Sequence, residues 1–393
     1  MAEDTGRMQA LMRPITIRGI ELPNRVMMSP MTRGASPNGV PTEAVARYYA
    51  RRAEGGVGTI ITESVFVNDK GTMGKFDLEA GDDVETGWPV MFNEAPLEGW
   101  RRVVDAVHAA GGKIFPQLMH LGIQRTPAKG ESWDDIHISS PSGIWGPPED
   151  IALLEPDAAA ARNCPEKAMT EDDIWAVINA FADAAANAKS VGFDGIALHG
   201  GHGYLIDTFL RGETNVRTDE WGGDHIQRTR FAVELVKAVR KAVGDELLIS
   251  FRFSQWTHHD VDAQLAKTPE QLKDILLALS DAGVDIFEAS ARDFRDLVFG
   301  DKTIAMLTRE FTGKPTVMVG GTGVRRERHE SALTPPQLID NVDEIMQRYE
   351  NGEFDLLAIG RSLLNDPDWL KKANSGETFA PFNPACLKIG YVK

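Results

Sequence analysis

One pattern recurs along most of the 393-residue chain and limits the folds that it can adopt. A glycine ends a helical stretch, and a short apolar segment of strand type begins a few residues later, as at Gly192 before residues 195–198. Glycine is the usual residue just past a helix, because it takes the left-handed conformation without strain. With a first strand near the N-terminus, the pattern predicts eight strands, at residues 26–29, 58–62, 113–118, 195–198, 247–251, 285–289, 315–319 and 354–359.

Helix starts fall between these strands. Thr170, Thr268 and Thr334 are each predicted to be an N-cap, and Pro269 and Pro335 then occupy the first helical position. Strands that alternate with helices indicate a parallel sheet. Eight such units favour a closed (β/α)₈ TIM barrel. An open doubly wound sheet is the alternative, although it more naturally has about five to seven strands.

Two long segments interrupt the regular spacing, at residues 65–94 and 121–169. Each follows the C-terminal end of a predicted strand, so we expect both to be lid insertions over one mouth of the barrel. Residues 15–22 predict a small hairpin that closes the opposite end. No linker is evident, so residues 1–393 are expected to form a single domain.

The charge balance limits the kinds of partner that the chain is expected to bind. The chain has 42 basic and 58 acidic residues, a net charge of −16, and no long basic run, which argues against nucleic acid and anionic membranes. No signal peptide or membrane-spanning run is expected. Only Cys164 and Cys386 are present, so we expect a cytoplasmic protein with reduced thiols and no cysteine-ligated iron–sulfur cluster.

Polar residues stand where the predicted strands end. The fourth strand runs directly into the pattern H-x-x-H-G-Y, which contains His199, His202 and Tyr204. The C-terminal ends of barrel strands are where active sites lie, and the intervening glycines allow a close approach of the backbone to a ligand. The alternative is a structural turn whose histidines bond to backbone carbonyls.

Glycines follow the seventh and eighth strands, at Gly320, Gly321 and Gly360, with Arg361 next. Barrels commonly bind a phosphate between these two loops, and arginine suits bidentate phosphate contact. The alternative is a tight turn beside a surface ion pair.

Gln117 and Arg252 lie within apolar strands, where an unpartnered polar side chain is costly. Together they suit a planar heterocycle whose edge alternates donors and acceptors. A buried salt bridge from Arg252, for instance to Glu63, is the alternative.

These features resemble the Old Yellow Enzyme family of FMN-dependent ene-reductases. The resemblance covers almost the whole chain through motifs in family order: NRVMMSPMTR at 24–33, EGGVGTIITES at 54–64, FPQLMHLG at 115–122, GFDGIALHGGHGYLIDTFL at 192–210, TNVRTDEWGGDHIQRTRF at 214–231, FRFS at 251–254, VGGTG at 319–323 and AIGRSLLNDPDW at 358–369.

The resemblance implies a role for each matching residue. NADPH or NADH would reduce the FMN, which would transfer hydride to the β-carbon of an α,β-unsaturated carbonyl or nitro compound. His199 and His202 would bind the substrate oxygen, and Tyr204 would protonate the α-carbon. The residues implied to contact the isoalloxazine are Pro30, Thr32, Ser64, Gln117 and Arg252. Those implied to hold the phosphate are Gly320, Gly321, Gly360 and Arg361.

The chain also departs from the family. Met119 stands where bulky aromatics are common, so it is expected to form a softer wall of the substrate pocket. The expected partner is a small electrophilic alkene, and the chain is expected to be a monomer or a homodimer.

Two other functions remain open at this point. A metal-dependent barrel hydrolase would use His199 and His202 as ligands, joined by His258, His259 or Asp260. A non-catalytic flavin-binding barrel would have no use for a proton donor at Tyr204. No metal is expected.

Overall fold

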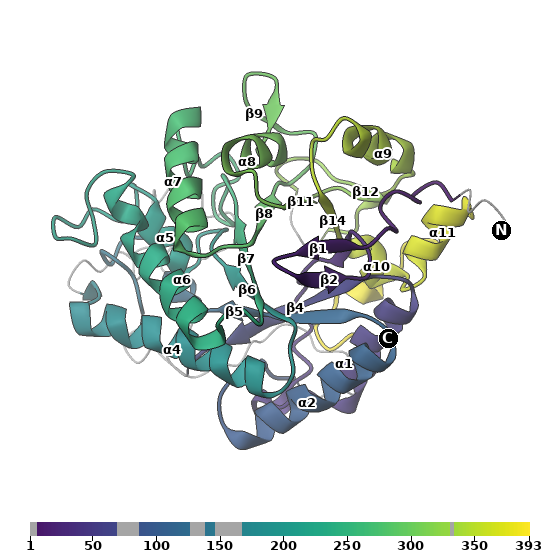
Figure 1. Ribbon diagram of the computed structural model, residues 1–393, viewed down its shortest axis with the longest axis horizontal. Helices are drawn as coiled ribbons and strands as arrows, with labels where there is room; N and C mark the ends of the chain where they lie inside the picture. Colours follow the sequence, from purple (N-terminus) through teal and green to yellow (C-terminus); the bar gives the residue numbers. More distant parts are fainter. Residues whose placement is uncertain (1–5, 69–85, 126–137, 146–166, 331–333) are drawn as a thin grey trace.

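The computed structural model describes residues 6–68, 86–125, 138–145, 167–330 and 334–393. Eight parallel strands close into a barrel in the order β11-β14-β3-β4-β5-β6-β7-β8 (Figure 1). The predicted TIM barrel is therefore confirmed, and the open sheet is wrong. The barrel strands are β3 (Val26–Met28), β4 (Thr59–Phe66), β5 (Lys113–Met119), β6 (Gly195–His199), β7 (Leu248–Phe253), β8 (Ile286–Ser290), β11 (Thr316–Val319) and β14 (Leu356–Ile359).

Helices surround the barrel and pack their apolar faces against the outside of the strands (Figure 1). The helices between successive strands are α1 (Glu43–Glu54), α2 (Glu94–Ala109), α4 (Glu171–Ser190), α6 (Arg230–Val243), α7 (Pro269–Ala282), α8 (Ile304–Thr312) and α9 (Val342–Glu350). Shorter helices are α5 (Leu205–Leu210), α10 (Arg361–Asn365) and α11 (Trp369–Ser375). A small hairpin before α8 pairs β9 (Leu297–Phe299) with β10 (Lys302–Thr303).

Two of the three predicted N-caps are confirmed. The side chains of Thr170 and Thr268 each accept a hydrogen bond from the backbone three residues on. The predicted helix start at Thr334 is wrong, because β13 (Gln337–Leu338) pairs there with β12 (Val324–Arg325). The side chain of Asn341 bonds to the backbone of Gly321 and Gly323, at 2.9 Å each, and so ties this segment to the loop after β11.

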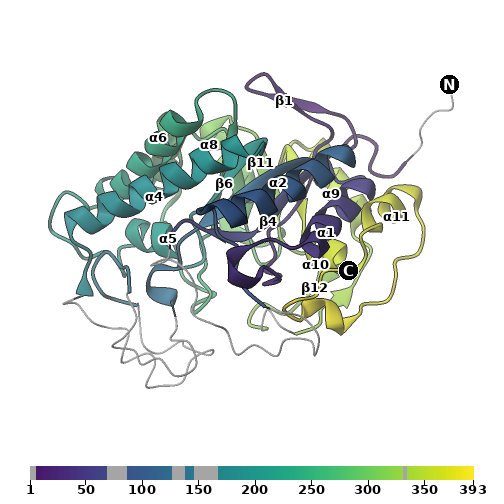
Figure 2. The same cartoon turned by 90° about the horizontal axis from the view of Figure 1, so that it is seen from below.

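The N-terminal hairpin of β1 (Ile15–Ile17) and β2 (Ile20–Leu22) forms as predicted. Ile17 and Leu22 are buried against the side chains that fill the barrel interior, among them Met27 and Phe115. Figure 2 shows the hairpin at one end of the barrel, with α5 and β12 toward the other. The hairpin therefore closes the N-terminal end and leaves the C-terminal end to the loops.

The first insertion begins later than predicted. Val65 and Phe66 belong to β4, where they pair with Leu118 and Met119 of β5. Phe66 also exchanges backbone hydrogen bonds with residues 89 and 91, so the end of the insertion extends the edge of this strand. Residues 69–85, and much of the predicted insertion at 121–169, lie outside the described residues.

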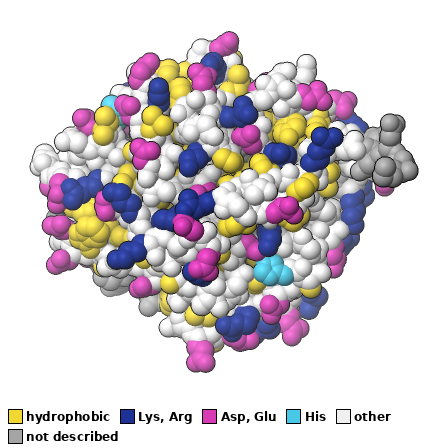
Figure 3. Space-filling model, in the orientation of Figure 1, with side chains coloured by type: hydrophobic (Ala, Val, Ile, Leu, Met, Phe, Trp, Pro, Cys, Tyr) yellow, Lys and Arg dark blue, Asp and Glu magenta, His cyan; other side chains and the backbone are white. Residues whose placement is uncertain are grey.

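The face around the hairpin carries interspersed acidic and basic side chains (Figure 3). Among the helices that the structure describes, none is long and apolar enough to cross a membrane.

Candidate active site

The alternation of the strands carries polar residues from the interior to the mouth of the barrel. Side chains two residues apart on a strand share a face. In β5, Gln117 follows the buried Phe115, and in β6, His199 follows Ala197. In β7 and β8 the same spacing leads from interior leucine and isoleucine side chains to polar ones. The residues that follow the interior layer in this way are Ser250, Arg252, Glu288 and Ser290.

The three residues of H-x-x-H-G-Y converge at this mouth. The ring centroid of His199 lies 5.1 Å from that of His202 and 4.8 Å from that of Tyr204, both edge to face. His202 has a φ of +63°, and its backbone N–H donates to Ser254 Oγ at 2.9 Å. A left-handed non-glycine residue is strained, and such residues often mark functional sites. The turn thus directs both imidazoles and the phenol to one place.

Burial sets the protonation of these groups. It lowers the pKa of His199 and His202 well below the usual value, and the charge of Arg252 adds to the effect. It raises the pKa of Tyr204 to about 12. At neutral pH the site therefore presents two neutral imidazoles, each with one N–H, and a phenol that keeps its proton.

Residues at the adjacent strand ends leave polar atoms unsatisfied. Gln117 Nε2, Arg252 Nε and His199 Nδ1 are buried and have no hydrogen-bond partner among the described residues. Ser64 Oγ donates to Gln117 Oε1 at 3.2 Å, which orients that amide. Buried polar groups are rarely left unpaired unless a ligand or water completes them. The donors of Gln117 and Arg252 fit the oxygen and nitrogen atoms along the edge of a flavin ring.

Pro30 and Thr32 lie on the loop after β3, where Pro30 is half-buried and Thr32 is exposed. Glu63 holds this loop, because its Oε2 accepts the backbone N–H groups of Arg33 and Gly34 at 2.8 Å each. The structure therefore brings the loop to the same mouth and leaves Thr32 open to a ligand.

The suggested ion pair between Arg252 and Glu63 is wrong. Arg252 pairs instead with Glu288, Nη1 to Oε2 at 3.4 Å. The reason is a bulge in β4, where the register with β5 shifts between Ile61 and Ser64. After Ile61, the next side chain on the interior face is therefore that of Ser64 rather than Glu63. The backbone N–H of Glu63 donates to Tyr49 Oη on α1.

The two loops predicted to hold a phosphate contain glycines in different settings. Gly320 and Gly321 have φ values of +125° and +76°, and a Cβ at Gly320 would lie 2.5 Å from the carbonyl oxygen of Ala291. A Cβ at Gly360 would meet nothing closer than Met31 Sδ at 3.7 Å, so the space beside this residue is open. Glycine is thus required at the first loop, and the second leaves room for a ligand.

Two further arginines lie near Arg361 that sequence reasoning missed. The pKa of Arg326 falls to about 10, through burial and then through the charges of Arg361 and Arg292. Mutual repulsion of this kind is relieved by a bound anion, and a phosphate dianion suits a cluster of guanidinium groups. For Arg326, the two consecutive arginines just after VGGTGV were the available signal.

The loop after β7 supplies Trp256, which sequence reasoning missed, and His258, which was considered only as a possible metal ligand. The ring centroid of Trp256 lies 4.3 Å from that of His202, and His258 lies 5.2 Å from His202 and 5.5 Å from Tyr204. The pKa of His258 falls to about 4, mainly through burial, so its ring is neutral at pH 7. The aromatic run QWTHH after a strand end was the signal. These rings form one wall of the site.

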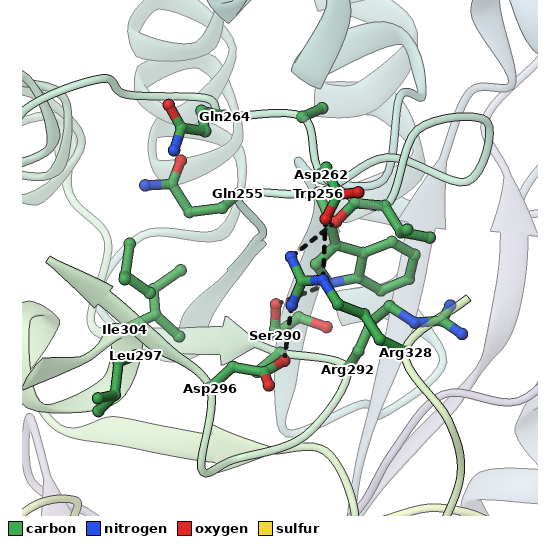
Figure 4. Close-up of a pocket in the computed structure, with 14 residues that line it drawn as sticks. Gln255, Trp256, Asp262, Gln264, Ser290, Arg292, Asp296, Leu297, Ile304 and Arg328 are labelled. Carbon is green, nitrogen blue, oxygen red and sulfur yellow. Dashed lines mark hydrogen bonds and ion pairs between the residues drawn. The ribbon is translucent and has the colours of Figure 1, made fainter. Parts of the chain in front are cut away.

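A hollow of about 100 Å³ lies beside Trp256 (Figure 4). Arg328 spans it between Asp262, at 2.8 Å, and Asp296, at 3.5 Å. The hollow shares Trp256 and Ser290 with the site but is not lined by its histidines or Tyr204. It therefore adjoins the site rather than forming it.

Met119, the expected wall of the substrate pocket, lies in an apolar cluster. It is 3% exposed and packs in a small cluster with Phe66, Val90 and Leu121, against which Tyr204 is also packed. Met119 therefore belongs to the cluster on which Tyr204 packs, and its role in the substrate pocket stays a prediction.

The metal-hydrolase alternative lacks a ligand set. Among the described residues, no group of three or more His, Cys, Asp or Glu side chains is arranged to hold a metal ion. The Nε2 atom of His202 lies 3.0 Å from Ser290 Oγ and is engaged there.

Known proteins share both the sequence and the architecture. Residues 10–378 match the profile of the NADH:flavin oxidoreductase / NADH oxidase family. The NADH oxidase of Thermoanaerobacter brockii is 32% identical over 92% of this chain, which spans only about half (50%) of that protein. A probable flavin mononucleotide-dependent alkene reductase of Leishmania infantum is 30% identical over 98% of this chain and 94% of its own length.

The solved structure of the Old Yellow Enzyme homologue from Zymomonas mobilis superposes with a TM-score of 0.75, at 25% identity and 98% coverage of both chains. The profile match spans the barrel and its mouth, and the orphaned donors and glycine cradle of that mouth fit FMN. The chain belongs to the Old Yellow Enzyme family of FMN-dependent NAD(P)H oxidoreductases.

Proposed function

We propose that this chain is an alkene reductase that uses NADH or NADPH to reduce α,β-unsaturated carbonyl or nitro compounds. The observation that carries the proposal is the convergence of His199, His202 and Tyr204 beside the unsatisfied donors of Gln117 and Arg252. An enzyme that only oxidised NADH would need neither a proton donor such as Tyr204 nor the hydrogen-bond donors His199 and His202. The alkene reductase of Leishmania infantum supports the same reaction class.

The cofactor is held from two sides. Gln117, Arg252 and Ser64 would bind the ring edge, with Pro30 and Thr32 from the loop after β3. Arg361 and the loops at Gly320, Gly321 and Gly360 would bind the phosphate, joined by Arg292 and Arg326. When bound, FMN supplies the hydride acceptor for the nucleotide and the hydride donor for the alkene.

The chain itself supplies activation and a proton. Neutral His199 and His202 would each donate one N–H to the substrate oxygen and so stabilise the negative charge that develops on it. Tyr204 would give its O–H proton to the α-carbon. A phenol whose pKa is about 12 holds that proton until a strong carbon base forms next to it.

The cysteine chemistry fits a reducing compartment. Cys386 is buried and forms no disulfide among the described residues, and burial raises the pKa of its thiol. We therefore include a cytoplasmic location in the proposal.

Isotope tracing tests the reaction directly. The purified enzyme is given 2-cyclohexenone without oxygen, first with C4-deuterated nucleotide in water and then with unlabelled nucleotide in D₂O. We expect NMR to find deuterium at the β-carbon of the product in the first case and at the α-carbon in the second. Nucleotide oxidation that requires oxygen, with no reduction of cyclohexenone or of a nitroalkene, would show an NADH oxidase instead.

A further inference from the structure

Ser290 lies between the cofactor side and the substrate side of the site. Its hydroxyl oxygen is 3.1 Å from Arg252 Nη2 and 3.0 Å from His202 Nε2. The residue ends β8 and is 1% exposed. Its backbone carbonyl accepts a hydrogen bond from Trp256 Nε1 at 3.1 Å, so the backbone is fixed as well. One buried hydroxyl thus contacts both a guanidinium and an imidazole.

The direction of these two hydrogen bonds follows from proton counting. A guanidinium only donates, so Ser290 Oγ accepts from Arg252. The hydroxyl still has one proton to place, and the acceptor within reach is His202 Nε2. If His202 donated from Nε2 instead, the buried serine proton would have no acceptor among the described residues, which is costly. The hydroxyl therefore donates to the ring.

We propose that Ser290 is a positioning residue that fixes the tautomer of His202, so that Nδ1–H is the donor offered to the substrate oxygen. Nδ1 makes no hydrogen bond to the described residues, so it is the nitrogen left for a ligand. The partner of one ring nitrogen sets the role of the other. The inference rests on the proposed function only in naming the substrate oxygen as the acceptor.

The other histidine of the pair differs. His199 Nδ1 is buried without a partner among the described residues, so no protein group selects its tautomer in this way. Ser290 therefore gives the two donors unequal roles. The tautomer of His202 is fixed before the substrate binds, whereas that of His199 can change when the substrate binds.

Ser254 offers a matched control. It is also a buried serine beside His202, but its Oγ accepts from the backbone N–H of His202 at 2.9 Å and donates to the carbonyl of Trp256 at 2.6 Å. Ser254→Ala thus removes a hydroxyl that holds the backbone of His202, and Ser290→Ala removes one that holds its ring.

The tautomer can be read from the FMN-loaded protein with ¹⁵N-labelled histidine, by NMR that correlates ring nitrogens with ring protons. His202→Asn assigns the signals among the nine histidines. We expect an unprotonated Nε2 and a protonated Nδ1 at His202 in the wild type. Ser290→Ala should give mixed or reversed protonation, Ser290→Thr should retain the wild-type pattern, and Ser254→Ala should leave it unchanged.

Phenol binding gives a second readout that needs no turnover. Ser290→Ala should weaken the binding of para-chlorophenol on the order of tenfold, as expected for a lost charge-assisted hydrogen bond. A protonated Nε2 at His202 in the wild type would overturn the inference without any variant. The same tautomer in Ser290→Ala would do so as well. Failure of alkene reduction with the wild-type tautomer intact would count against the proposed function alone.

Discussion

Arg252 and Glu288 form an ion pair inside the mouth of the barrel, with Nη1 3.4 Å from Oε2. The second carboxylate oxygen of Glu288 accepts from Ser250 Oγ at 2.9 Å. Burial raises the pKa of Glu288 and lowers that of Arg252, and the charge of each partner opposes the shift. The cation that is proposed to meet the ring edge is therefore balanced by a carboxylate behind it.

Glu288→Gln should raise the reduction potential of the bound FMN. The substitution leaves the charge of Arg252 unbalanced next to the ring, and this charge favours the more negative reduced form. We expect a rise on the order of 30 mV, which corresponds to about 1.4 kcal/mol for two electrons. Equilibration with a reference dye measures it, and Glu246→Gln on the surface is the control. A lower potential would show that Arg252 does not act on the ring.

Phenol binding should show no histidine titration. If His199 or His202 had an ordinary pKa, protonation would strengthen phenolate binding as the pH falls below about 6.5. Burial lowers the pKa of both, so we expect no such increase between pH 8 and pH 5.5. His199→Ala and His202→Ala should each weaken binding by roughly 1–3 kcal/mol. The long-wavelength band of the phenol–flavin complex reports the affinity, and unchanged affinity in both variants would make the pair structural.

Glu63→Gln should become more stabilising as the pH rises. The pKa of Glu63 is raised to about 7 by burial, above its ordinary value of 4.5, so the folded state binds the proton more tightly. Stability is therefore full below pH 4.5 and falls as the pH rises through 7. The amide keeps an acceptor for Arg33 and Gly34 without this penalty, which amounts to at most roughly 3 kcal/mol.

Urea unfolding of both FMN-loaded proteins at pH 5 and pH 8 measures the difference. Glu98→Gln, at an exposed position, is the control and should give no pH-dependent difference. An equal difference between wild type and Glu63→Gln at both pH values would contradict the shift.

The arginine cluster should distinguish FMN from riboflavin. Arg361→Leu and Arg326→Leu should each weaken FMN binding by roughly 1.5–3 kcal/mol, the range for a charged hydrogen bond. Riboflavin, which lacks the phosphate, should bind as before. Arg325→Leu removes a neighbouring but exposed arginine and serves as the control. Fluorescence titration of the apoprotein measures the flavin affinity of all three variants. Equal losses of affinity for FMN and riboflavin would show that the phosphate binds elsewhere.

Much of this architecture could be predicted because its signals are local. Seven of the eight strands follow glycines that take positive φ at helix ends, such as Gly192, Gly283 and Gly313. His199, Gln117 and Arg252 could be placed at the mouth because a period of two carries them there from an apolar interior. The helix expected at Thr334 does not form because this segment pairs as β13 with the distant β12, and Asn341 ties it to the loop after β11.

The contacts between strands could not be predicted in the same way. The bulge in β4 turns Glu63 away from Arg252, and a one-residue change of register is invisible without the neighbouring strand. Ser290, Glu288 and Trp256 lie on segments that carry no family motif among those recognised. Their roles depend on hydrogen bonds of 3.1–3.4 Å between β7 with its following loop and β8, which join residues more than 30 positions apart in sequence.

Tyr204 is proposed to give the proton to the substrate and to take no part in reduction of the cofactor. Tyr204→Phe removes only the hydroxyl, so the variant should keep its FMN, its phenol band and a near-normal rate of flavin reduction by the nucleotide. Nitroalkenes should be affected less than enones, because their nitronates are stable enough to leave unprotonated.

Stopped-flow absorbance of the two half-reactions measures this directly. With Tyr204→Phe, we predict that flavin reoxidation by 2-cyclohexenone slows by about 10²–10⁴-fold, the usual contribution of a general acid, while flavin reduction stays near the wild-type rate. Equal slowing of both half-reactions, or no slowing of the second, would contradict the account.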